Sequence, residues 1–150
     1  MAVICLMTFS VFASAQKSRA SVPASEVNGT FRMNFSGKFK GSFDEVKILA
    51  LGHGKLHFAL DLLYPYIVKG ELSANIGQLD GEASILGDTA VYKSAEFGKC
   101  TITIKKFVMP GKIKVSQEGS DFDCGFGHHV TADGTYKKIS SKRPKFDTPK

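Results

Sequence analysis

The feature that most constrains the fold is a regular alternation of apolar and polar residues, in short runs separated by glycine, from residue 28 onward. Phe31, Met33 and Phe35, for example, share one face of the first run and alternate with polar neighbours. A period of two residues is typical of β-strands with one buried face, and stretches with a helical period are nearly absent. The sequence therefore predicts an all-β domain.

We expect about eight such strands, joined in order by tight turns without a long crossover, and thus an antiparallel meander. Pro65 should end the third strand, a fourth should cover residues 68–76, and a separate strand should follow at residues 82–86. Because ring closure removes exposed edges, we predict a closed barrel, lipocalin-like or inhibitor-like, in which residues 29–31 pair with residues 134–136. A two-sheet β-sandwich is the alternative.

The first fifteen residues, MAVICLMTFSVFASA, are uncharged and end in Ala-Ser-Ala, the small-residue pattern that signal peptidase recognises. We therefore expect residues 1–15 to be a signal peptide that is cleaved before Gln16, and residues 16–27 to be a flexible lead-in. The apolar run is too short to span a bilayer, so no membrane span is predicted. It lacks the usual preceding Lys or Arg, which suggests that the natural chain starts upstream of Met1.

Removal of the signal peptide takes Cys5 with it and leaves an even pair, Cys100 and Cys124. In a secreted or periplasmic protein such a pair is expected to form a disulfide. A cross-link that closes a loop of about 25 residues is worth about 3.5 kcal/mol in the chain-entropy model. Two buried free thiols are the alternative.

The composition, 43% hydrophobic and 23% charged over 150 residues, is that of one ordinary globular domain, which we assign to residues 28–138. Residues 139–150 form a basic tail. From Lys137 onward, six Lys or Arg residues accompany only Asp147, which accounts for +5 of the formal net charge of +6. We expect a solvated terminus here, although such a tail could also contact phosphate-bearing partners.

The most unusual segment is residues 121–130, which combine rings, glycines, acids and histidines. Binding loops at one barrel end are expected to use aromatic anchors and adaptable polar groups, and the candidates here are Phe122, Phe126, His128 and His129. The structural alternative is that Cys124 pins the segment to the barrel and its rings cap the mouth. Adjacent histidines in a strand point to opposite faces, so neither a metal nor another cofactor is predicted.

No catalytic constellation stands out in the sequence. It contains neither a nucleophile elbow nor a zinc-protease helix. His57 and Asp61 would share one face of a strand, but they are too far apart in it for direct hydrogen bonding. We therefore predict a protein that is not an enzyme. Nucleic-acid binding is not expected either, because the aromatic residues fall on core faces and the basic surplus is in the tail.

Three elements resemble a largely uncharacterised family of small exported bacterial proteins, some of whose domains accompany LprI-type lysozyme-inhibitor modules. These elements are an Ala-Val-Tyr strand at residues 90–92, a Cys-x-Ile-x-Ile strand at residues 100–104, and a Cys-Gly-Phe-Gly segment that runs to Ala-Asp-Gly-Thr-Tyr at Tyr136. The chain is also similar to MliC-type inhibitor barrels, in which a Ser-Gly loop enters the enzyme cleft. The corresponding loop is residues 86–88, where Leu86 replaces the serine.

The resemblance implies an exported, non-catalytic binding protein of the bacterial cell envelope that binds or inhibits a lysozyme-like cell-wall hydrolase. An alternative is a carrier that holds a small apolar ligand inside the barrel, since core-facing Phe and Leu residues fill a barrel or line a pocket equally well. A hydrolase is a remote third.

Overall fold

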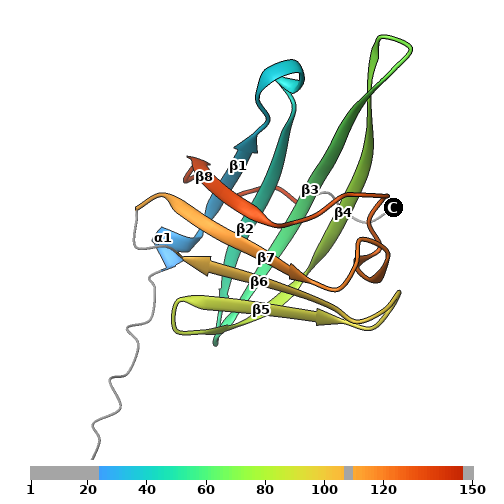
Figure 1. Cartoon of the computed structure of the whole chain (residues 1–150). Helices are drawn as coiled ribbons and strands as arrows, with labels where there is room; N and C mark the ends of the chain where they lie inside the picture. The colour runs from blue at the N-terminus through green and yellow to red at the C-terminus, as the bar shows by residue number, and fades with distance from the viewer. Residues whose placement is uncertain (1–23, 107–109, 147–150) are drawn as a thin grey trace, which may run out of the picture.

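Eight antiparallel strands follow one another around a closed ring of hydrogen bonds, as the alternation predicts, rather than dividing into two sheets (Figure 1). The computed structural model describes residues 24–106 and 110–146, so the expected signal peptide lies outside the described residues. The strands are β1 (Gly29–Asn34), β2 (Phe43–Gly52), β3 (Lys55–Val68), β4 (Glu71–Leu86), β5 (Thr89–Ser94), β6 (Cys100–Lys106), β7 (Lys112–Glu118) and β8 (Gly134–Ser140). The short helix α1 (Ala24–Val27) precedes β1, and the 3-10 turns η1 (Gly37–Phe39) and η2 (Phe122–Cys124) lie in two of the loops.

Two-residue turns with left-handed backbone join the longest strands. His53 and Gly54 have φ angles of 51° and 71° between β2 and β3, and Lys69 and Gly70 have φ angles of 50° and 84° between β3 and β4. Two consecutive residues with positive φ are typical of the type I′ turn, whose twist matches that of the strands on either side. These turns therefore fix the antiparallel order of the first half of the ring.

The first and last strands close the ring, but not at the expected residues. Thr30 pairs with Ser140 and Arg32 pairs with Lys137, with a register shift between residues 30 and 31. Residues 134–136 pair with β7 instead. The last strand runs on to Ser140 although the alternation does not continue beyond Tyr136, because Lys138 follows on the side of Tyr136 and Ile139 lies on the outer side.

The inward faces of the strands form one continuous hydrophobic core, to which Val27 of α1 adds a partly buried side chain. Tyr136 is its largest fully buried side chain, and its hydroxyl donates a hydrogen bond of 3.0 Å to the carbonyl of Ala132. A buried phenol that keeps a partner for its hydroxyl avoids the desolvation penalty of an unpaired polar group. Other fully buried members are Phe31, Val46, Ile48, Phe58, Leu60, Leu62, Ile102 and Val115.

The hairpin of β3 and β4 makes the ring uneven, because its two strands have 14 and 16 residues and project beyond their neighbours (Figure 1). The prediction that Pro65 ends a strand was wrong, since Pro65 lies inside β3 and pairs with Ala74. Pairing between β2 and β3 stops at Glu45 and Asp61, so no strand on that side needs a donor from Pro65. The separate strands expected at residues 68–76 and 82–86 are likewise one strand, β4, which begins only at Glu71.

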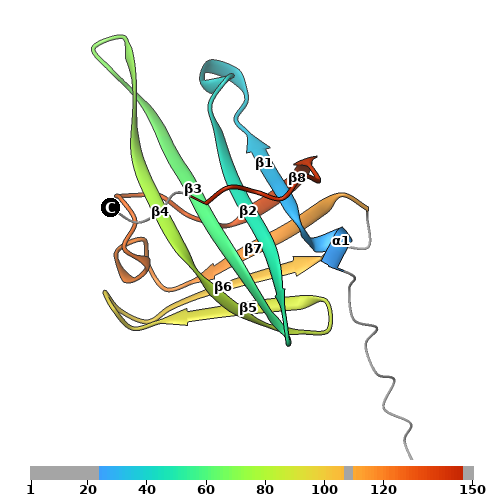
Figure 2. The same ribbon diagram turned by 180° about the vertical axis from the view of Figure 1, so that it is seen from behind.

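The C-terminal segment crosses the outside of the barrel rather than leaving it as a solvated tail (Figure 2). β8 extends to Ser140, beyond the predicted domain boundary, and Pro144 is buried. The ring of Phe146 stacks on His57 of β3 with a centroid distance of 4.0 Å, and His57 also lies 2.8 Å from a carboxylate oxygen of Asp80. The described part of the tail is therefore attached to the outer face of the sheet. Residues 147–150 lie outside the described part of the chain.

Among residues 24–106 and 110–146, no helix has the length and hydropathy needed to cross a membrane.

Candidate binding surface

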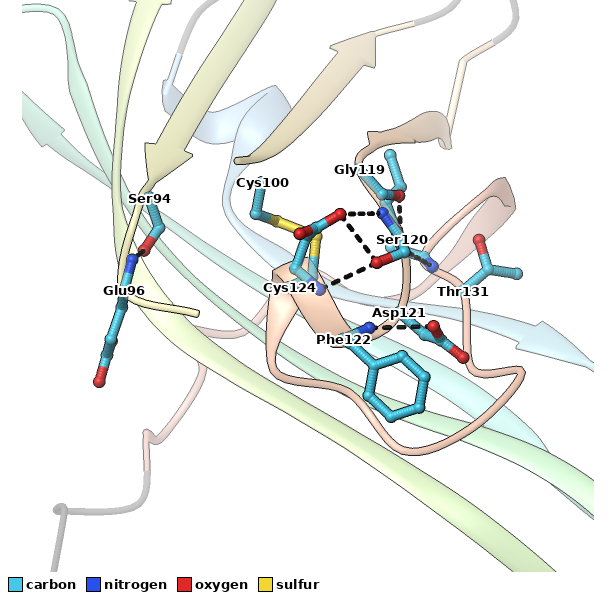
Figure 3. Close-up of a disulfide and its surroundings, with 12 residues drawn as sticks. Ser94, Glu96, Cys100, Gly119, Ser120, Asp121, Phe122, Cys124 and Thr131 are labelled. Carbon is cyan, nitrogen blue, oxygen red and sulfur yellow. Dashed lines mark hydrogen bonds between the residues drawn. A yellow bond between two sulfur atoms is a disulfide. The ribbon is translucent and has the colours of Figure 1, made fainter. Parts of the chain in front are cut away.

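A disulfide between Cys100 and Cys124 attaches the long loop between β7 and β8 to the start of β6, as the cysteine count predicts (Figure 3). Both cysteines are buried. The cross-link spans 24 residues of sequence and brings the two Cα atoms to 4.9 Å. It therefore holds this loop against one end of the barrel.

The loop is further ordered by its own acidic residues. One carboxylate oxygen of Asp123 accepts hydrogen bonds of 2.8 Å from both the backbone N–H and the hydroxyl of Ser120. The N–H of Ser120, followed by its hydroxyl, lowers the pKa of Asp123. Gly98 lies so close to this carboxylate that a side chain at residue 98 would collide with it. These contacts hold the loop in a defined conformation.

The inner side of the loop plugs the barrel end, and Phe126 belongs to this plug. Its ring and Val130 pack on Gly77 of β4, where an added Cβ would lie 2.9 Å from the ring of Phe126 and 2.7 Å from Val130. Phe126 is only 4% exposed and is part of the core cluster. The backbone N–H of Gly127 donates to the carbonyl of Ile76 at 2.9 Å. Phe126 is therefore a core residue, and the expectation that it anchors a partner at the surface is corrected.

The outer side of the loop carries the other three predicted residues in contact with one another. The ring centroids of Phe122 and His128 are 6.0 Å apart, and those of His128 and His129 are 3.7 Å apart. Tyr64 of β3 continues the series, with its centroid 5.1 Å from that of His129. We call these four side chains, Phe122, His128, His129 and Tyr64, the ring row. All four are exposed, Phe122 at 63% and Tyr64 at 42%.

The two histidines share one side because this segment is a turn and not a strand. His129 has a φ of 66°, in the left-handed region, and its N–H donates a hydrogen bond of 2.6 Å to Asp121. The same carboxylate oxygen lies 3.7 Å from Nδ1 of His128. The N–H of His129, followed by that of Phe122 and the charges of the two histidines, holds the pKa of Asp121 below its usual value. The expectation that the two imidazoles point to opposite faces assumed an extended backbone and was wrong.

Tyr64 is the member of the ring row that the sequence does not reveal. It has the parity of the inward-facing residues of β3, but it lies beyond the last pair between β2 and β3, so its ring is not enclosed. Asn75, which pairs with Tyr64 across the hairpin, donates from its amide nitrogen to the carbonyl of His128 at 2.7 Å. This bond links the loop to the hairpin and brings Tyr64 beside His129.

The described residues include no group of three or more His, Cys, Asp or Glu side chains that could hold a metal ion. His57 and Asp61, which the sequence places on one face of a strand, each contact β4: His57 contacts Asp80, and Asp61 accepts a hydrogen bond of 2.9 Å from Gln78. Neither is part of the ring row.

Residues 86–88, compared above with an inhibitor-type loop, lie at the other end of β4 from the ring row, and Leu86 is 81% exposed. Beside it a pocket of about 50 Å³ opens at the α1 end of the barrel, lined by residues such as Val27, Ile104 and Lys112. Drug-sized ligands need roughly 300 Å³ or more. This pocket is smaller than that range.

Comparisons with known proteins add no relative: no protein-family model, no curated protein and no solved structure matches this chain.

Proposed function

We propose that this protein is a non-catalytic binding domain that contacts a protein partner through the ring row. The observation that carries the proposal is the series of ring contacts from Phe122 through the two histidines to Tyr64, which is exposed although it is held in place by the disulfide and by Asp121. Aromatic residues are enriched at the few interface positions that contribute most of the binding energy. A surface that is rigid before binding loses little conformational entropy on association.

The surroundings of the ring row also favour a protein partner. Val68, four residues after Tyr64 in β3 and therefore on the same face of the hairpin, is 48% exposed, whereas the exposed side chains of Ile67, Leu72 and Ile76 lie on the opposite face. Contiguous apolar exposure bordered by polar groups is typical of protein interaction sites. The ring row and Val68 together offer apolar surface of the kind that such an interface uses.

Two lines of support suggest the class of partner. The disulfide is typical of proteins that work in an oxidising compartment, which agrees with export to the periplasm or the cell exterior. The resemblance to exported proteins associated with lysozyme inhibitors makes a lysozyme-like cell-wall hydrolase the first partner to test. We therefore propose an exported protein of the bacterial cell envelope that binds or inhibits such a hydrolase.

Binding to a panel of purified lysozymes, measured by biolayer interferometry, tests the proposal. The double variant F122A/H128A should bind at least about 30-fold more weakly than the wild type, because loss of one strong interface residue costs about 2 kcal/mol or more. The control is Leu86→Ala, which removes an apolar side chain that is even more exposed than Phe122, at the other barrel end, and should leave binding unchanged. If Leu86→Ala weakened binding and the double variant did not, the interface would lie at residues 86–88 and not at the ring row.

A further inference from the structure

Four lysines form two directly opposed pairs on the outer face of β6, β7 and β8. Lys105 of β6 faces Lys114 of β7, and Lys112 of β7 faces Lys137 of β8. We call these four residues the lysine staircase, because each step moves either across to the next strand or two residues along β7. The arrangement depends on register alone and places all four side chains opposite the buried faces of Ile113 and Tyr136.

No carboxylate occupies the nearest positions on this face. Among the described strand residues, the outward neighbours two positions away are Thr103, Ser116, Thr135 and Ile139, and the residue that faces Lys105 from β5 is Thr89. Arg32 faces Lys137 from β1, but its guanidinium is bound to Glu45 at 2.7 Å. Among the residues that the structure describes, none of the four lysines takes part in an ion pair.

Like charges that lie directly opposite each other in a sheet repel and destabilise it. Two such pairs on adjoining strands add their charges to one local positive potential on this face. A polyanion that binds this face reduces the repulsion between the lysines. Its own condensed counterions are released at the same time, and both effects favour binding.

The shape of the staircase suggests which kind of anion fits. Neighbouring strands are about 4.8 Å apart and residues two apart in a strand are about 6.8 Å apart, so the charged positions follow a diagonal line across three strands. A flexible chain with a charged group at each repeat can follow such a line over a convex barrel wall. No aromatic residue is a member of the staircase, so recognition would use charge and not base stacking.

We propose that the lysine staircase binds a linear phosphate-bearing polymer. Lys112 lies at the α1 end of the barrel and lines the pocket there, whereas the ring row is at the opposite end, so polymer and protein partner could bind together. This inference does not depend on the proposed protein partner.

Titration of the full chain with inorganic polyphosphate at several salt concentrations tests this site. The slope of log K against log salt should be near −3 for the wild type, since each neutralised phosphate contributes about −0.7 on a flexible chain. The variant K112Q/K114Q should halve that slope and lower the affinity about tenfold at low salt. The matched control is K38Q/K40Q, which removes the same charge from two exposed lysines in the loop between β1 and β2.

The proposal holds if the control keeps the wild-type slope and if vesicles with anionic lipid compete weakly at equal phosphate concentration. An equal loss of polyphosphate affinity in the two double variants would mean that net charge attracts the polymer without a defined site, and would overturn the proposal. Stronger binding to vesicles than to polyphosphate, or binding to a single-stranded oligonucleotide but not to polyphosphate, would also contradict it. The ring-row variant F122A/H128A should bind polyphosphate as the wild type does.

Discussion

The carboxylate of Asp44 accepts a hydrogen bond of 2.7 Å from the backbone N–H of Leu63, just beyond the last residue pair between β2 and β3. Asp44 thus satisfies a donor of β3 at the point where the two strands separate. The side chain is only 2% exposed, and burial raises the pKa of Asp44 to about 6, although the Leu63 N–H acts in the opposite direction. At neutral pH the fold therefore holds a buried negative charge at this fork, the point where β2 and β3 separate.

This charge predicts a specific pH dependence of stability. Because the pKa of Asp44 is higher in the folded state than in the unfolded chain, the folded protein binds the proton more tightly. The resulting stabilisation is complete below about pH 4 and is lost as the pH rises through about 6, with a size on the order of 3 kcal/mol. Asp44→Asn, which stays neutral and keeps an acceptor oxygen, should therefore exceed the wild type in unfolding free energy at pH 7 and match it near pH 4.

Urea denaturation between about pH 3.5 and 7.5 measures this difference. The matched control is Asp61→Asn, which changes a partly exposed carboxylate on the outer face of β3 and should preserve the wild-type pH profile. An Asp44→Asn variant that is less stable than the wild type at pH 7 would show that the ionised carboxylate is needed at the fork.

The disulfide should contribute to stability as a single unit. Cys100→Ser and Cys124→Ser should each lower the unfolding free energy by about 2 to 5 kcal/mol, and the double variant should lose little more, because either change removes the same cross-link. Wild-type protein in reducing buffer should give the same value in denaturant titrations. Losses that add in the double variant would mean that each cysteine packs independently of the cross-link.

Replacement by alanine should lower the unfolding free energy strongly at Phe126 and hardly at all at Phe122. Phe126→Ala opens a cavity beside Gly77 and should cost about 3 to 5 kcal/mol, whereas Phe122→Ala removes an exposed ring and should change the unfolding free energy by less than about 0.5 kcal/mol. Chemical denaturation of the two variants under identical conditions makes the comparison. Similar losses would contradict the division of the loop into an inner plug and an outer surface.

If the lysines of the staircase repel one another, replacing one of them should raise the free energy of unfolding. Lys114→Glu replaces a like-charge pair with an opposite-charge pair facing Lys105 and should raise the unfolding free energy by about 0.2 to 1 kcal/mol. The gain should shrink in high salt, which screens exposed charges. Lys114→Gln, which only removes the repulsion, should gain less. A loss of stability at low salt would mean that Lys114 is not repelled by its neighbours.

Most of the fold was predictable because the period-two alternation runs through the paired parts of the strands, as in β2 and the first half of β3. The errors arise where strands leave the ring. Pro65 normally ends a strand that has partners on both sides, but only β4 pairs with β3 at that point. The sequence contains no local signal of where β2 stops pairing, since that point depends on how the whole ring closes.

The candidate surface was predictable in part. The unusual composition of residues 121–130 drew attention to Phe122 and the two histidines, which the structure places in contact. Composition could not show that Phe126 faces inward, because that follows from the missing side chain of Gly77 on another strand. Tyr64 could not be predicted either, since its contact with His129 depends on packing between segments far apart in the sequence.

The central claim is that a protein partner binds at the ring row, and amide hydrogen exchange in the complex tests it most directly. With the lysozyme that binds most tightly, we expect new protection in residues 120–130 and in the part of the β3–β4 hairpin around Tyr64 and Asn75, where the loop and hairpin are linked. The α1 end, including residues 86–88, should exchange as in the free protein. Protection confined to residues 86–88, or the absence of any complex with the lysozymes tested, would contradict the account.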